Sequence, residues 1–216
     1  MAEPCRLVVL ISGSGSNLQA LIDAIARGDL AATVAGVVSN KADAFGLERA
    51  RAAGIPTSVI DHRQFGSREQ FDAELCARVQ DFRPDLVVLA GFMRILTPVF
   101  LRPFVGRLIN IHPSLLPKYP GLCTHQRALD AGDAEAGATV HFVTEELDGG
   151  PAIVQASVPV LADDSAEQLT ARVLQVEHRL YPIAVQWFAT GRLHLAGNVA
   201  LLDGSALPVT GFIYKD

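Results

Sequence analysis

Cysteine is scarce in this chain of 216 residues, which holds only Cys5, Cys76 and Cys123, at wide spacing. An odd number of cysteines without a CxxC pair argues against a disulfide framework or a cysteine-based metal site, and is typical of a reducing compartment. Long apolar runs are also missing, because the first run, Leu7 to Ile11, is too short to cross a membrane or to direct export. We therefore expect a cytoplasmic protein without a membrane partner.

Basic residues are not in excess either. The 18 Lys and Arg residues are outnumbered by 23 Asp and Glu residues, which gives a net charge of −5. Domains that bind nucleic acid usually carry a surplus of positive charge, so we expect no nucleic-acid partner. Because the overall charge would weakly repel an anion, a site for a phosphate group would have to be formed by local groups.

Hydrophobic residues, by contrast, make up 50% of the chain, and in its first half they form short runs that alternate with amphipathic segments. Strands are expected at Leu7–Ile11, Val34–Val38, Pro56–Ile60, Leu86–Ala90 and Leu108–Ile111. Helices are expected from Leu18, across Ala44–Ala53 and after Ser67, where Ser67 and Gln70 predict a capping box. Continuous apolar strands separated by amphipathic helices predict an α/β fold with a mainly parallel twisted sheet and helices on both faces, of the Rossmann type.

The second half is less regular. The expected elements are strands at Thr139–Val143 and Ile153–Val160 and a long helix capped by Ser165 and Gln168. Pro182 either kinks or ends that helix. The tail from Gly191 predicts a short C-terminal hairpin or an extended arm. No repeat or linker interrupts the chain, so we interpret residues 1–216 as a single domain.

The first loop, Ser12 to Asn17, reads SGSGSN between a predicted strand and a predicted helix. Glycines let the backbone approach an anion, and the free N–H groups of a helix N-terminus point toward it. The loop lacks a Walker lysine, and Leu18 stands where the third glycine of GxGxxG would be, so a nucleotide site is not implied. Phosphate binding and an ordinary capped turn both remain open.

Three polar residues suggest a reaction centre. Strand alternation places Asn110 and His112 on one face at the carboxyl end of the fifth strand, where open parallel sheets bind ligands. Asp148 lies in the acidic turn EELDGG. An amide that donates to an oxyanion and a histidine near a carboxylate suit acyl transfer without a covalent intermediate, since neither a GxSxG elbow nor a catalytic cysteine motif is present.

Structural roles remain the alternative for each residue taken alone. A histidine at the end of a strand is usually structural, and an aspartate before two glycines is usually a turn residue. His141 has the pattern of a structural or supporting residue rather than a catalytic one. Metal binding by His112, His125 and His141 matches no standard ligand spacing.

Several motifs together resemble one family. They are the loop Leu10–Asn17, SNKA at 39–42, LAGFMRIL at 89–96, NIHPSLLPKYPG at 110–121 and HFVTEELDGGP at 141–151. The chain resembles the phosphoribosylglycinamide formyltransferases, the folate-dependent glycinamide ribonucleotide transformylases of purine synthesis, over nearly its whole length. The resemblance implies 10-formyltetrahydrofolate as co-substrate, glycinamide ribonucleotide as acceptor, no metal, and a monomer or homodimer. It also implies a formyltransferase-like fold whose N-terminal half binds the phosphorylated substrate and whose C-terminal half binds folate and carries catalysis.

The resemblance further implies roles for individual positions. The residues expected to bind the ribonucleotide are Gly15, Ser16, Asn17 and Glu177. The residues expected to bind folate are Arg68, Met93, Arg94, Ile95, Leu96, Asn110, Thr144, Glu145, Glu146 and Leu147. The catalytic residues are expected to be Asn110, His112 and Asp148. Without the resemblance, Arg68 and Glu177 would be interpreted as exposed helix residues, and Met93 and Ile95 as core residues.

Two departures and three rival functions remain. Members of the family often have a histidine where this chain has Cys123 and a long polar residue where it has Leu174, which bears on phosphate affinity. Methionyl-tRNA formyltransferases usually add a domain for tRNA, and formyltetrahydrofolate deformylases normally begin with a regulatory domain. A noncatalytic folate-binding protein on the same scaffold is the rival from a different class.

Overall fold

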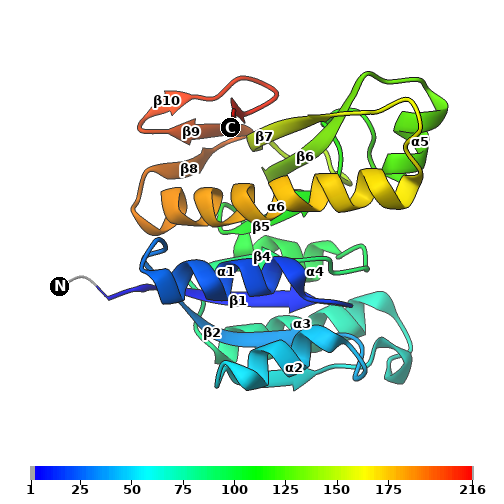
Figure 1. The fold of residues 1–216 in the computed structure, drawn as a ribbon. Coiled ribbons are helices and arrows are strands. Elements are labelled where there is room, and N and C mark those ends of the chain that lie inside the picture. Colours follow the sequence, from blue (N-terminus) through cyan, green and yellow to red (C-terminus); the bar gives the residue numbers. More distant parts are fainter. Residues whose placement is uncertain (1–2, 216) are drawn as a thin grey trace.

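The apolar runs of the first half form the centre of an eight-stranded sheet in the computed structural model, which describes residues 3–215 (Figure 1). The strand order is β11-β7-β6-β5-β4-β1-β2-β3. The strands are β1 (Cys5–Ile11), β2 (Ala32–Ser39), β3 (Thr57–Val59), β4 (Leu86–Leu89), β5 (Leu108–His112), β6 (Glu135–Phe142), β7 (Ala152–Pro159) and β11 (Phe212–Ile213). Strands β1 to β5 pair in parallel, whereas β6 is antiparallel to both β5 and β7. The predicted mainly parallel sheet is confirmed.

Helices cover both faces of the sheet, as predicted. The helices are α1 (Ser16–Arg27), α2 (Phe45–Ala52), α3 (Arg68–Asp81), α4 (Pro98–Leu101), α5 (Thr124–Asp130) and α6 (Ala166–Ala189), with short 3-10 turns at His62–Gln64 and Arg102–Phe104. Alternation along β1 sends Leu7 and Val9 into the core under α1, α2 and α6, and sends Val8 and Leu10 into the core under α3 and α4. In Figure 1, α1 and α6 lie side by side across the near face.

Of the two predicted capping boxes, one is complete and the other is only half formed. At α6 the capping box is complete, because Ser165 Oγ accepts from Gln168 N and Gln168 Oε1 accepts from Ser165 N. At α3, Ser67 Oγ accepts from Gln70 N, but the Gln70 side chain accepts from Gly66 N, so that box is only half formed. Pro182 does not end α6, which continues to Ala189.

The C-terminal tail forms both structures that the sequence left open. Strands β8 (Leu193–Ala196), β9 (Val199–Leu202) and β10 (Ser205–Ala206) make a small antiparallel sheet. The chain then returns, and β11 adds to the edge of the main sheet beside β7. Helices α4 and α5 were not predicted, since each is short and lacks a clear apolar period. Strand β6 starts at Glu135, earlier than the predicted Thr139.

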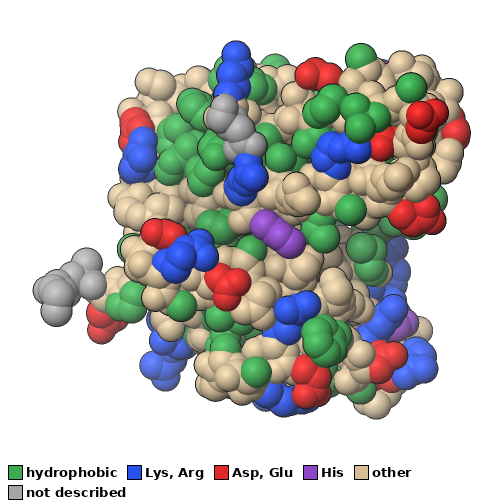
Figure 2. Space-filling view, in the orientation of Figure 1, with side chains coloured by type: hydrophobic (Ala, Val, Ile, Leu, Met, Phe, Trp, Pro, Cys, Tyr) green, Lys and Arg blue, Asp and Glu red, His purple; other side chains and the backbone are tan. Residues whose placement is uncertain are grey.

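The surface above α1 and α6 carries charges of both signs, as expected from the charge balance of the chain. Figure 2 shows this face, where Lys and Arg side chains are interspersed with Asp and Glu side chains rather than gathered into one basic area. No helix formed by residues 3–215 is both long enough and apolar enough to span a membrane.

Tyr181 attaches α6 to the carboxyl ends of the central strands. Its side chain is fully buried, and its hydroxyl donates to Leu89 O at 2.7 Å and lies 3.2 Å from Ile109 O. Burial raises the pKa of the Tyr181 hydroxyl well above its ordinary value, so it acts as a neutral donor. One phenol therefore holds the long helix against both β4 and β5.

We expect Tyr181→Phe to lower the free energy of unfolding by about 1–2 kcal/mol, because a buried hydrogen bond to backbone is lost without a change in packing. Urea denaturation followed by circular dichroism measures the change. Tyr214→Phe, at a half-buried position near the C-terminus, is the control and should change stability by less than about 0.5 kcal/mol. Equal stability of the two variants would contradict this role for Tyr181.

Candidate active site

Asn110, His112 and Asp148 converge at the carboxyl end of β5. Asn110 and His112 lie on the same face of that strand, as predicted, and Asp148 approaches from the loop between β6 and β7. The distance between His112 Nδ1 and Asp148 Oδ2 is 3.6 Å. Asp148 Oδ1 lies 3.9 Å from His141 Nε2, and that nitrogen is 3.2 Å from Asn110 Nδ2. The structure therefore brings the amide, the imidazole and the carboxylate into one cluster.

The backbone around Asp148 explains how its carboxylate is aimed. Asp148 has φ of 52°, a left-handed conformation that is unusual for a residue other than glycine. Two residues later, a Cβ on Gly150 would lie 1.8 Å from Phe142 O, so only glycine permits this close turn. The backbone N–H of Gly121 donates to Asp148 Oδ2 at 2.8 Å and links the carboxylate to the loop after β5.

His112 is buried, with hydrogen-bond acceptors near both of its ring nitrogens. Nε2 lies 2.8 Å from Tyr119 O. A carbonyl can only accept, so Nε2 carries a hydrogen, and Nδ1 is the nitrogen that faces Asp148. Both ring nitrogens of His112 therefore face oxygen atoms, Tyr119 O on one side and the Asp148 carboxylate on the other.

His141 differs from His112 in both position and surroundings. Its Nδ1 lies 2.8 Å from Phe142 O, so Nδ1 donates and Nε2 is left to accept from Asn110 Nδ2. Burial lowers the pKa of His141 from 6.5 to about 4, which keeps the ring neutral. The neutral ring orients the Asn110 amide, uses one of its two N–H hydrogens and leaves the other free. The sequence indicated only that His141 was structural or supporting.

The first loop lies at the N-terminus of α1. Gly15 precedes the helix with φ of 69°, and a Cβ there would meet the Cα of Gly46 at 2.5 Å. Asn17 is buried and donates from Nδ2 to Glu177 Oε2 at 2.7 Å. A hollow of about 220 Å³ is lined by residues 12–17, Ala90, Gly91 and Met93. The residues predicted to bind the ribonucleotide are thus brought together, although Asn17 and Glu177 are far apart in the sequence.

Glu177 is not the exposed helix residue that its type alone suggested. Its relative exposure is 7%, and burial raises the pKa of its carboxyl group, an effect that the hydrogen bond from Asn17 partly offsets. Leu174, one turn earlier on α6, is half-buried. A buried carboxylate beside the first loop is suited to accept hydrogen bonds from the hydroxyl groups of a ligand.

A second hollow, of about 110 Å³, lies on the other side of the cluster. It is lined by Arg94, Ile95, Leu96, Asn110, His141 and the loop from Thr144 to Asp148, together with apolar residues of β4 and α4. Arg68 reaches this segment from α3 and donates to Ile95 O at 2.7 Å. Met93 and Ile95 are 64% and 58% exposed, so neither is a core residue. Met93 lines the first hollow rather than this one.

Ser12 and Asn40 tie the first loop to the segment 89–96, a role that the sequence did not reveal. Ser12 Oγ donates to Asn40 Oδ1 at 2.5 Å and accepts from Met93 N at 2.8 Å. The segment 89–96 contributes residues to both hollows. The motif SNKA at 39–42, one of those that carry the family resemblance, was the only available signal for a role of Asn40. Within the described residues, no three His, Cys, Asp or Glu side chains group as metal ligands would.

The pH dependence of stability should reveal the neutral state of His141. Because the folded-state pKa lies below the unfolded value, the unfolded chain binds more protons between pH 6.5 and about 4, so stability is lost as pH falls through this window. Between pH 7 and pH 5 the free energy of unfolding should fall in the wild-type protein, and we expect this fall to be smaller by roughly 1–2 kcal/mol in His141→Asn. Urea denaturation at both pH values measures it, and parallel curves for the two proteins would contradict a neutral buried His141.

Comparisons with known proteins identify the family of the chain. A family model described as Formyl transferase matches residues 5–185. The phosphoribosylglycinamide formyltransferase of Escherichia coli is 59% identical over 96% of this chain and 98% of its own length. The structure of the enzyme of that name from Coxiella burnetii, in complex with CHES, is 50% identical in sequence. It superposes with a TM-score of 0.95 and covers 99% of this chain and 100% of that chain. A human trifunctional purine biosynthetic protein is 46% identical over 91% of this chain, which corresponds to 19% of that protein. The chain therefore belongs to the formyl transferase family and, within it, to the phosphoribosylglycinamide formyltransferases.

Proposed function

We propose that this protein transfers the formyl group of 10-formyltetrahydrofolate to the amine of glycinamide ribonucleotide, a step of purine synthesis. The observation that carries the proposal is the convergence of Asn110, His112 and Asp148 beside a hollow whose wall segment, 89–96, also lines the hollow of the first loop. Direct transfer needs two substrates to meet at one reacting carbon, and two adjoining hollows around a polar cluster supply that arrangement.

The ribonucleotide binds in the hollow of the first loop. Its phosphate lies against the backbone N–H groups of Gly15, Ser16 and Asn17 at the N-terminus of α1, where the helix dipole favours an anion. Glu177 accepts hydrogen bonds from the ribose, and Asn17 holds the Glu177 carboxylate in place. This local arrangement offsets the net negative charge of the chain.

The folate binds in the second hollow. Backbone groups of Met93, Arg94, Ile95 and Leu96 face the pterin-like ring, and the loop from Thr144 through Glu145, Glu146 and Leu147 closes over it. The exposed apolar surface of Ile95 and Leu147 is then covered by the ligand. Arg68, at the rim and joined to Ile95 O, lies near the acidic tail.

The transfer begins when the substrate amine attacks the formyl carbon, forming the new C–N bond and an oxyanion. The free N–H of Asn110 and the Nδ1 side of protonated His112 stabilise that oxygen. Asp148, beside Nδ1, balances the charge of the imidazolium. The bond between the formyl carbon and folate N10 then breaks, while the proton lost by the attacking amine is passed to N10 with the help of Asp148.

The reaction assigns no step to a metal, because the co-substrate already carries the group to be transferred. Both partners are small molecules. We further propose that the protein acts in the cytoplasm, as a monomer or a homodimer, with no nucleic acid or membrane partner.

A panel of acceptors tests the proposed function. With 10-formyltetrahydrofolate as donor, we expect a formylated product from glycinamide ribonucleotide and none from formyl-accepting tRNA, measured by mass spectrometry together with release of tetrahydrofolate. The control omits the acceptor. Rapid release of formate without an acceptor would instead indicate a deformylase, and tight folate binding without any transfer would indicate a binding protein.

Substitution of the oxyanion donors tests the catalytic assignment. We expect Asn110→Ala and His112→Ala each to lower kcat by about 100- to 1,000-fold, the usual cost of losing one donor. Asn198→Ala and His194→Ala, at exposed positions, are matched controls and should leave kcat unchanged. Circular dichroism verifies that each variant folds. A loss below about tenfold for both Asn110→Ala and His112→Ala would contradict the assignment.

A further inference from the structure

The loop after β5 supplies the hydrogen-bond partner of His112. His112 Nε2 donates to the carbonyl oxygen of Tyr119, seven residues later. Residues 113–123 contain no helix or strand, and their only sheet-like contact is the bridge between Leu115 and Lys118. Since no regular ladder fixes this carbonyl, its position depends on the side chains that hold the loop.

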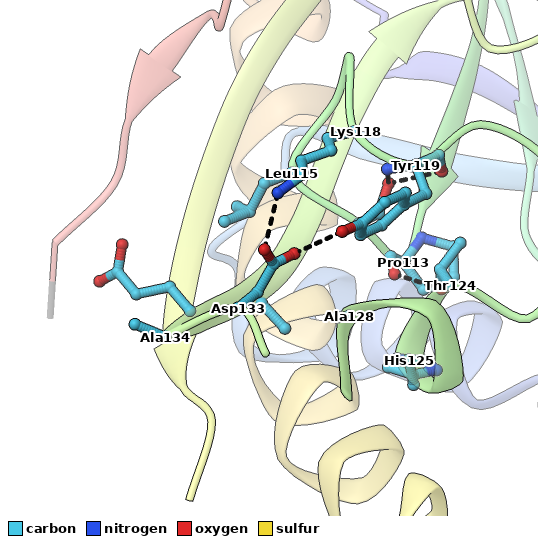
Figure 3. Close-up of a pocket in the computed structure, with 12 residues that line it drawn as sticks. Pro113, Leu115, Lys118, Tyr119, Thr124, His125, Ala128, Asp133 and Ala134 are labelled. Atoms are coloured by element: carbon cyan, nitrogen blue, oxygen red, sulfur yellow. Dashed lines mark hydrogen bonds and ion pairs between the residues drawn. The ribbon is translucent and has the colours of Figure 1, made fainter. Parts of the chain in front are cut away.

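Asp133 holds two consecutive residues of this loop. Its Oδ2 accepts from the Tyr119 hydroxyl at 2.7 Å, and its Oδ1 accepts from Lys118 Nζ at 2.6 Å (Figure 3). These hydrogen bonds, the one from Lys118 first, lower the pKa of Asp133, so it stays ionised. Asp133 itself lies just before β6, the strand that pairs with β5. The contact therefore ties the loop to the strand next to His112.

The other contacts of the loop are closer to its base. Ser114 Oγ donates to Tyr119 O at 2.9 Å and accepts from Tyr119 N at 3.1 Å. Buried Thr139 donates to Ser114 O, and buried Gln155 donates to Leu116 O. Ser114 thus holds the Tyr119 backbone directly, and Thr139 and Gln155 hold the start of the loop, but none of these bonds holds the Tyr119 phenol.

The half-buried Tyr119 side chain packs against the larger apolar core on one side only. A cavity of about 300 Å³ lies behind the loop, lined by Leu115, Lys118, Tyr119, His125 and Asp133 among others (Figure 3). A loop that borders a cavity has few van der Waals partners on that side, so its hydrogen bonds carry more of its order. Half-buried Arg127 lies over the Tyr119 ring at 4.7 Å and donates to Pro120 O.

We propose that Asp133 and Tyr119 are positioning residues for His112: the Asp133 carboxylate holds the Tyr119 phenol, and the Tyr119 carbonyl thereby holds the imidazole with Nε2 protonated and Nδ1 toward Asp148. This clamp acts only through His112, and its effect on turnover rests on the proposed formyl transfer. Lys118 is not part of it, because its side chain is 60% exposed and an exposed ion pair contributes little.

Kinetics of three variants test the clamp. Tyr119→Phe removes one hydroxyl and keeps the ring, Asp133→Ala removes its partner, and the double variant removes both. We expect each single variant to lower kcat about tenfold with KM for either substrate changed less than about twofold. The double variant should lose no more than the single ones, since both act through one contact. Lys118→Met is the control and should retain wild-type kcat.

The ring of His112 gives a readout that does not depend on turnover. In 15N-labelled wild-type protein, we expect a slowly exchanging Nε2–H signal from His112, which is retained in Lys118→Met and lost to exchange with water in Tyr119→Phe. Should Asp133→Ala fail to fold, Tyr119→Phe decides the matter by itself. Should the wild-type protein transfer no formyl group, the proposed function fails while the ring signal still tests the clamp. An unchanged Nε2–H signal in Tyr119→Phe, a loss confined to KM, or additive losses in the double variant would overturn the proposal.

Discussion

The pairing of β5 with β6 is the constraint on which the rest of the site depends. At β5 the sheet changes from parallel to antiparallel, so the carboxyl end of this strand is flanked by two different environments. On one side the parallel partner β4 leads into the segment 90–96, and on the other side β6 runs in the opposite direction. The register places Asn110 opposite His141 and His112 opposite Thr139. A shift of this register by one residue would turn Asn110 and His112 toward the other face and separate them from His141.

The same pairing gives two neighbouring histidines different surroundings. His141 donates to its own neighbouring carbonyl and is fully enclosed, so desolvation dominates and the ring stays neutral. His112 has an oxygen near each nitrogen, and the carboxylate of Asp148 lies closer to it than to His141. A neutral ring can orient an amide, and a charged ring can stabilise a negative oxygen. The surroundings of each ring, rather than its residue type, therefore decide which groups it can contact.

Some of this site follows from the sequence by elementary rules, and some does not. Strand alternation was enough to place Asn110 and His112 on one face. The burial of Glu177 was also within reach, because it falls at helical spacing from Val173 and Tyr181 on the apolar stripe of α6. The exposure of Met93 and Ile95 was not within reach, since residue type alone favours the core. The role of Tyr119 could not be seen at all, because it contributes a backbone carbonyl that every residue possesses.

Ser12 shows how the walls of the two hollows are held rigid together. If the amine attacks the formyl carbon directly, the two substrates must be held in register to a fraction of an ångström, and no covalent intermediate relaxes that demand. The first loop belongs to β1 and α1, whereas the segment 90–96 follows β4, so independent motion of the two would separate the reacting atoms. Ser12 Oγ accepts from Met93 N and donates to Asn40, which joins the ends of three parallel strands by side-chain hydrogen bonds. Tyr181 likewise holds α6, and with it Glu177, against the sheet through its hydrogen bonds to β4 and β5. The relative placement of the two substrates is thus set by polar contacts at the carboxyl edge of the sheet, while the two apolar cores beneath provide the stability that those contacts require.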